Sequence, residues 1–155
     1  MTDVGIGIMR NRMMFVAVAA GVLLVAACSD DGKSSSTTAG GGPLVSVTAL
    51  DKSATAEFTL DRTSVKAGPV TFTFVNNGKR QHEMIILKTD EAFDALVVGA
   101  DHRVGEDASV GEISETDAGK TVVSTFDLAA GNYVLVCDIP LHYEQGMRAA
   151  FTVTP

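Results

Sequence analysis

The stretch CDIPLHYEQGM, residues 137–147, places a thiol, an imidazole and a thioether close together in the chain. They belong to Cys137, His142 and Met147, and each is a soft or borderline donor for metal ions. The same letters also fit a strand end followed by an ordinary loop. The sequence on either side of the stretch therefore decides between a metal site and a loop that contains these residues by chance.

Cys137 closes a segment with the alternation of a β-strand. Tyr133, Leu135 and Cys137 have the same parity, so the thiol is expected to point to the same side as two core-forming side chains. The alternative is that Cys137 is an inert core cysteine, since free cysteines are among the most buried residues. Its position at the end of the strand favours the metal site.

The other donors are expected to gather around Cys137. Residues 138–146 form a loop that contains His142, and Met147 opens the next strand. His82 begins an apolar strand elsewhere in the chain, and the usual folding of a sandwich brings that strand end to the same pole. Each residue also has a plainer interpretation, namely a surface histidine for His82 and a core methionine for Met147.

The rest of the chain has the pattern of an all-β protein. The clearest strand is residues 67–78, in which Val70, Phe72 and Phe74 share one face. The predicted strands are residues 43–50, 54–60, 67–78, 82–89, 121–128, 132–139 and 147–155, of which 121–128 and 132–139 are expected to form a hairpin. Residues 90–97, DEAFDALV, are a helix candidate. The pattern predicts a Greek-key β-sandwich with one short helix in a long connection.

The combination of donors points to copper. Thiolate and thioether ligands select copper among the biological metals, and imidazole suits both of its common oxidation states. A trigonal plane of two His and one Cys with a weak Met ligand is the blue-copper arrangement. Zinc sites more often use several cysteines or carboxylates, and Cys137 is the only cysteine of residues 44–155.

The order His82…Cys137-x₄-His142-x₄-Met147 resembles the cupredoxin family of plastocyanin and azurin over residues 44–155. Further features match it: Asn76-Asn77-Gly78, Ala130-Gly131-Asn132-Tyr133, Pro140, and Gly146-Met147. The sequence departs from the family at Leu141, where relatives often have Gly, and this departure is expected to alter the loop and expose an apolar side chain.

The resemblance implies a role for each residue. Cys137 would be the thiolate ligand, His82 and His142 would complete the plane, and Met147 would be the axial ligand. His142 would be the solvent-facing edge for electron exchange. An apolar docking patch would surround it, formed by Pro140, Leu141 and Tyr143.

The first 27 residues are predicted to be a lipoprotein signal peptide. Arg10 and Arg12 precede an apolar run that is shorter than the ~20 residues of a membrane-spanning helix. The run ends in Val25-Ala26-Ala27-Cys28, which resembles the lipobox of bacterial lipoproteins and implies lipidation of Cys28. The alternatives are an uncleaved anchor or an ordinary signal peptide, and translation starting at Met9 instead of Met1 stays open.

Residues 28–43 are predicted to be a flexible Gly/Ser-rich tether that follows the lipidated cysteine. The domain would then hang from the outer face of the bacterial cytoplasmic membrane. Removal of residues 1–27 takes away Arg10, Arg12 and Asp3, which changes the formal net charge from −7 to −8. This acidity disfavours nucleic acid as a partner and favours redox proteins with a basic docking face.

The function predicted from these features is a membrane-tethered, monomeric carrier of single electrons with one copper ion. The alternative is a module that delivers or buffers copper with the same four ligands. An enzyme is rejected, because copper oxidases and nitrite reductases need more histidines than the three in this chain. No nucleophile–base pair or phosphate-binding loop is present.

Overall fold

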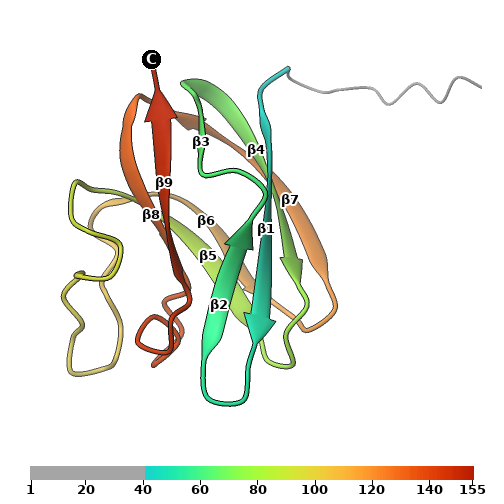
Figure 1. Cartoon of the computed structure of the whole chain (residues 1–155), viewed down its shortest axis with the longest axis vertical. Helices are drawn as coiled ribbons and strands as arrows, with labels where there is room; N and C mark the ends of the chain where they lie inside the picture. The colour runs from blue at the N-terminus through green and yellow to red at the C-terminus, as the bar shows by residue number, and fades with distance from the viewer. Residues whose placement is uncertain (1–40) are drawn as a thin grey trace, which may run out of the picture. The chain divides into compact units, whose positions relative to one another are not determined.

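The computed structural model describes residues 41–155, which form two β-sheets packed face to face (Figure 1). The strands are β1 (Leu44–Asp51), β2 (Ala56–Leu60), β3 (Ser64–Lys66), β4 (Gly68–Asn76), β5 (His82–Lys88), β6 (Ser109–Thr116), β7 (Thr121–Leu128), β8 (Gly131–Val136) and β9 (Arg148–Thr154). The predicted signal peptide, Cys28 and residues 29–40 of the predicted tether lie outside these residues. In the described part, no helix has the length and apolarity to cross a membrane.

The strands are divided between a four-stranded sheet in the order β2-β1-β4-β7 and a five-stranded sheet in the order β3-β9-β8-β5-β6. The chain changes sheet after β2, β3, β4, β6 and β7, so the all-β sandwich predicted from the sequence is confirmed. The predicted hairpin between β7 and β8 is wrong. β7 pairs with β4 and β8 pairs with β5 and β9, and Gly131, at a φ of 152°, carries the chain across to the second sheet.

The inner faces of both sheets form the main core. Val70, Phe72 and Phe74 of β4 are fully buried, as the alternation predicted. Phe72 packs against Phe151 with ring centroids 5.5 Å apart, which joins β4 to β9 of the opposite sheet. Cys137 belongs to the same core cluster, so the thiol lies at the end of a continuous apolar interior.

The outer face of the five-stranded sheet carries a second, smaller core. Ile85, Leu87, Val134 and Val136 point to this side and pack with Tyr143. The apolar side chains that cover them come from the connection between β5 and β6: Leu96, Val98 and Val104. Burial on both faces explains why β5 is continuously apolar instead of alternating.

The predicted helix at residues 90–97 does not form. The segment holds a single turn closed by Ala95 N–H to Ala92 O (2.9 Å) and is otherwise irregular. The Tyr143 hydroxyl accepts a hydrogen bond from Leu96 N–H and donates one to Phe93 O, both at 3.0 Å. These are backbone groups that a helix would pair internally, so packing on the sheet overrides the helix-like spacing.

β6 was not predicted from the sequence. It is an edge strand, and of its eight residues only Ile113 and Thr116 are buried. Its register against β5 shifts twice, between His82 and Met84 and between Ile86 and Leu87. Because bulges and an exposed edge both remove regular alternation, the segment carries no clear strand signal.

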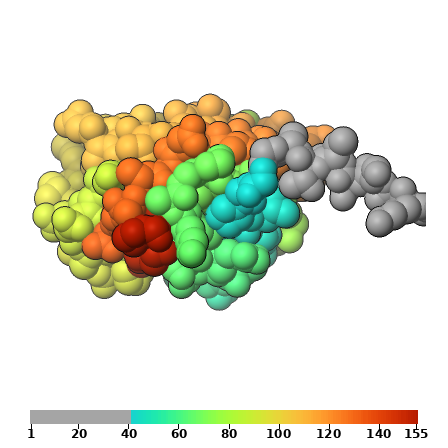
Figure 2. All heavy atoms as spheres, turned by 90° about the horizontal axis from the view of Figure 1, so that it is seen from above, coloured from blue at the N-terminus to red at the C-terminus, as the bar shows by residue number. Residues whose placement is uncertain are grey.

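The two poles of the sandwich differ. β1, β4 and β8 end, and β2, β5, β7 and β9 begin, at the pole that carries His82 and residues 137–147. β1 begins at the other pole, where β9 ends. Figure 2 looks onto this second pole and shows the C-terminal residues and the start of β1 with the segment around β3 between them.

Candidate metal centre

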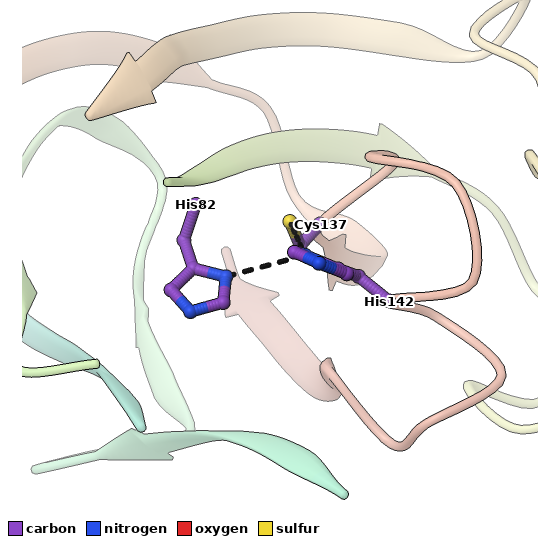
Figure 3. A group of neighbouring side chains, drawn as sticks. All are labelled: His82, Cys137 and His142. Carbon is purple, nitrogen blue, oxygen red and sulfur yellow. Dashed lines mark hydrogen bonds between the residues drawn. The ribbon is translucent and has the colours of Figure 1, made fainter. Parts of the chain in front are cut away.

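Three of the predicted ligands converge at one point. His82 is the first residue of β5, Cys137 follows β8, and His142 lies in the loop between β8 and β9. Their donor atoms all lie within 4.8 Å of one another. Nδ1 of His142 is 3.2 Å from both His82 Nδ1 and Cys137 Sγ, and Figure 3 shows both rings and the sulfur facing the same small space.

The loop that carries His142 is closed by backbone hydrogen bonds. Met147 N–H donates to His142 O (3.0 Å) and Cys137 N–H donates to Met147 O (3.1 Å). These bonds tie the three predicted ligands of the loop to one another. The Met147 side chain is fully buried in the main core, to which Cys137 also belongs.

The side chain of Leu141 is exposed, as its departure from the family suggested. Its φ is 73°, in the left-handed region that favours glycine, and its side chain is 44% exposed. Leu141 N–H donates to the carbonyl of His102 (3.2 Å), which is the other non-glycine residue with positive φ among residues 41–155. The predicted docking patch therefore retains Leu141 and Pro140, which are exposed, but Tyr143 is only 4% exposed and lies in the second core.

His82 is held by the turn that precedes it. Asn76 is fully buried, and its side chain donates to the carbonyls of Arg80 and Thr116 (both 2.8 Å) and accepts from Gly78 N–H (2.9 Å). The Asn-rich turn noted in the sequence thus fixes the path from β4 to β5. It delivers the His82 ring to the cluster with no exposed surface.

Burial keeps both imidazoles neutral. Desolvation lowers the pKa of His142 to about 4, with a further contribution from the Arg80 charge. It also lowers the pKa of His82, although the neighbouring Asp51 carboxylate opposes this shift. Both rings therefore keep a free lone pair at neutral pH, which is the form that binds a metal.

The thiol is protonated in the metal-free protein. Desolvation raises the pKa of Cys137 to about 12, despite hydrogen bonds to the sulfur from the backbone N–H groups of Glu83 and Ile139. A bound cation would take the place of that proton. The two N–H groups then remain as fixed donors to the thiolate.

Glu83, the residue after His82, is a buried carboxyl on the outer face of the sheet. It is 5% exposed, and its Oε1 has no hydrogen-bond partner among the described residues. Burial raises its pKa to about 7, and the Glu115 carboxylate adds to this effect.

His102 and Met84 take no part in the cluster. His102 is exposed and its Nδ1 lies 2.9 Å from Glu144 Oε2. Met84 is fully buried in the main core.

Three residues around the cluster were missed by sequence reasoning: Asp51, Arg80 and Gln145. Asp51 Oδ2 is 3.3 Å from His82 Nε2, and Arg80 bridges Asp51 to Gln145. An aspartate at a strand end and an arginine in a turn have no spacing that links them to a histidine. No sequence signal would have found them.

The chain is similar to known copper proteins in both sequence and fold. The family model described as copper binding proteins, plastocyanin/azurin family, matches residues 45–154. The chain belongs to this family. No curated protein matches the chain.

Several solved cupredoxin structures are similar to the chain. Auracyanin A, a "blue" copper protein from Chloroflexus aurantiacus, has 27% identity and a TM-score of 0.51, covering 73% of this chain and 100% of its own. Auracyanin from Roseiflexus castenholzii has 24% identity and a TM-score of 0.54, with 74% and 98% covered. Rusticyanin from Thiobacillus ferrooxidans has 23% identity and a TM-score of 0.52, with 72% and 77% covered. The last two show the fold alone.

The residues present fit the copper ion that this cupredoxin family binds. One thiol and two neutral imidazoles face one another in a buried space. This donor set matches the three in-plane ligands of a type 1 copper site.

Proposed function

We propose that the chain is a mononuclear type 1 copper protein that carries single electrons between redox proteins. His82, Cys137 and His142 would hold the ion, and Met147 would be the axial ligand. The observation that carries this proposal is the burial of His82 Nδ1, His142 Nδ1 and Cys137 Sγ within 4.8 Å of one another. Copper bound there would supply one-electron chemistry by alternating between Cu(I) and Cu(II).

The surrounding chain keeps the ligands in place in the metal-free state. His82 is fixed by strand β5, and the loop around His142 is fixed by its own backbone bonds. Four side chains exclude water from the site, because His82, Cys137, His142 and Met147 are at most 4% exposed. Preformed, dry ligands reduce the rearrangement that accompanies electron gain or loss.

Electron exchange is proposed to occur at the pole that carries His142. His142 is 4% exposed whereas His82 has no exposed surface, so His142 provides the ligand edge nearest to a partner. Pro140 and Leu141 supply the exposed apolar contact beside it. The partners would be redox proteins at a membrane surface.

We further propose that the protein is exported and tethered to the outer face of the cytoplasmic membrane through a lipid on Cys28, as a monomer. The lipobox-like sequence before Cys28 and the Gly/Ser-rich residues 28–43 support this proposal. The chain would act as a carrier and not as an enzyme. Delivery or buffering of copper would require an ion that exchanges readily, and the burial of the donors disfavours it.

The proposal is tested by a visible absorption spectrum of residues 29–155 after addition of Cu(II), after ascorbate, and after reoxidation. An intense thiolate-to-copper band that bleaches and returns is expected. A copper complex without this band, with Cys137 still reactive toward a thiol reagent, would contradict the site. Transfer of the copper to a chelator within seconds would instead favour the delivery function.

A further inference from the structure

We infer that Asp51 is a positioning residue for His82: its carboxylate accepts the Nε2–H of the imidazole and fixes the tautomer that leaves Nδ1 free for the metal. The effect of Asp51 on copper binding rests on the proposed function. The contact between Asp51 and His82 belongs to the metal-free chain and does not depend on it. Asp51 is the last residue of β1 and comes from the opposite sheet to β5.

The Asp51 carboxylate is held in a fixed position by several donors. Its Oδ2 accepts hydrogen bonds from Lys79 N–H (2.6 Å) and Arg80 N–H (3.2 Å), and its Oδ1 accepts from Arg80 Nε (3.0 Å) and Nη2 (2.7 Å). The remaining neighbour is His82 Nε2 at 3.3 Å from Oδ2. With four bonds from elsewhere, the carboxylate cannot rotate away from the imidazole without breaking them.

The backbone leaves room for this contact only because residue 78 is a glycine. A Cβ at Gly78 would lie 2.6 Å from Asp51 Oδ2 and 2.7 Å from His82 Nε2. A methyl group there would be wedged between the carboxylate and the ring. The φ of Gly78 is not in the left-handed region, so close approach is the reason that this position needs glycine.

Arg80 extends the arrangement to the loop that carries the second histidine. Its Nη2 also donates to Gln145 Oε1 at 3.0 Å, and Gln145 O accepts from Ala56 N–H at 3.1 Å. The end of β1, the turn before His82 and the loop around His142 are thereby joined by one guanidinium group. The two imidazoles are positioned relative to each other before any ion binds.

The chemical consequence follows from the proton on the ring. A neutral imidazole carries its proton on one nitrogen, and a hydrogen bond to that nitrogen decides which one. With Asp51 as the acceptor at Nε2, the lone pair lies on Nδ1, the atom that faces His142 and Cys137. The negative charge also makes the ring a stronger donor and favours Cu(II) over Cu(I).

The first test needs no copper. The metal-free protein, residues 29–155, is labelled with ¹⁵N at histidine and examined by NMR near pH 8, with Asp51→Asn assigning the affected ring. The His82 ring is expected to carry its proton on Nε2, in slow exchange with water. A proton on Nδ1 would overturn the inference, whatever the protein binds.

The second test measures copper. Asp51→Asn is expected to lower Cu(II) affinity about 10- to 100-fold, the usual cost of losing a partner of a ligating histidine. If Cu(I) affinity is unchanged, each tenfold loss raises the reduction potential by about 59 mV. Unchanged affinity and potential would overturn the inference.

Asp61→Asn is the matched control. Asp61 also accepts a backbone N–H, from Ser46, and also pairs with an arginine, Arg62. It follows β2 at the pole away from the cluster, so its variant should match the wild-type potential. A shift of equal size in Asp61→Asn would mean that net charge alone is responsible, and the inference would be wrong.

Gly78→Ala keeps the experiment decisive if Asp51→Asn does not fold. It retains every charge and separates Asp51 from His82, so it should lower Cu(II) affinity in the same direction. Wild-type affinity and spectrum in a folded Gly78→Ala protein would contradict the inference. Failure of the wild-type protein to bind copper would instead overturn the proposed function, and the NMR result on His82 would still stand.

Discussion

The two histidines of the cluster are held in different ways. His82 begins a strand, has no exposed surface, and contacts a carboxylate that is itself bound by the turn preceding the strand. His142 lies in a loop that is closed by backbone hydrogen bonds, next to an exposed leucine with positive φ. The His82 half of the centre is therefore supported by a neighbouring side chain, whereas the His142 half lies beside exposed residues.

This difference separates two requirements of an electron carrier. The ligands must not move when the charge of the ion changes, and an electron must still reach the outside. In the proposed electron carrier, the His82 half would meet the first requirement and the His142 half would meet the second. The connection between β5 and β6 adds support to the His142 half, since the Tyr143 hydroxyl binds it at Phe93 and Leu96.

Cys137→Ser is expected to have the largest effect, because both halves depend on the sulfur. Serine replaces a soft donor with a hard one that copper does not select. The intense visible band should disappear entirely, while the metal-free variant should still fold. Absorption spectra and circular dichroism check the two parts. A surviving band would show that the two histidines do not share the thiolate.

Acid is expected to weaken the metal-free protein through the histidines. His142 has a pKa of about 4 in the folded chain and about 6.5 when unfolded. The unfolded chain therefore takes up the proton first, and the free energy of unfolding should fall as the pH drops from 6.5 to 4, by up to about 3 kcal/mol. His82 shifts in the same direction.

This pH dependence should be measured by urea unfolding in the Glu83→Gln background. The pKa of Glu83 is raised to about 7, so the folded chain retains that proton and Glu83 contributes a slope of the opposite sign between about pH 4.5 and 7. A flat profile in Glu83→Gln would contradict neutral, buried imidazoles. NMR titration of each ring would give the separate contributions of His82 and His142 to this pH dependence.

Tyr143→Phe is expected to lower the free energy of unfolding by about 1–3 kcal/mol, because Leu96 N–H and Phe93 O lose their partner. Hydrogen exchange at Leu96 should accelerate. Tyr133→Phe is the control, since the Tyr133 side chain belongs to the main core and its hydroxyl donates to Ala129 O, so exchange at Leu96 should be unchanged. Unaltered exchange in Tyr143→Phe would show that the connection does not depend on this residue.

Leu141→Gly is expected to have the smallest effect. A left-handed conformation costs a residue with a side chain about 1–2 kcal/mol, and glycine loses about 0.5–1 kcal/mol through its greater freedom in the unfolded chain. The net result should be a stabilisation of no more than about 1.5 kcal/mol, measured by thermal unfolding. Ala129→Gly, outside the loop, should not stabilise. A destabilised Leu141→Gly would mean that the exposed side chain supports the loop through its packing.

The sequence predicted much of the centre. Cys137, His142 and Met147 are close in the chain, and the residue types are restrictive enough to identify His82 as the missing donor. Asp51 and Arg80 could not be found in this way, because their role depends on three segments meeting in space. The predicted ligand set remains a prediction until copper is measured on the protein.

The fold was predictable where apolar and polar side chains alternate along a strand, as they do at Val70, Phe72 and Phe74 of β4. Prediction failed where contacts with residues distant in the sequence decided the local structure. β6 lies at an edge with an irregular register, and residues 90–97 are irregular because the Tyr143 hydroxyl binds their backbone. The β7–β8 hairpin failed because the Gly131 backbone carries the chain to the other sheet.

The direction of β1 determines which pole of the domain is joined to the preceding chain. β1 begins at Leu44 and ends at Asp51, beside His82, so it spans the domain for about 23 Å at ~3.3 Å per residue. A domain fastened to a surface through the chain before Leu44 would therefore be attached at the pole opposite its copper end, and the attachment would leave that end free to meet a partner.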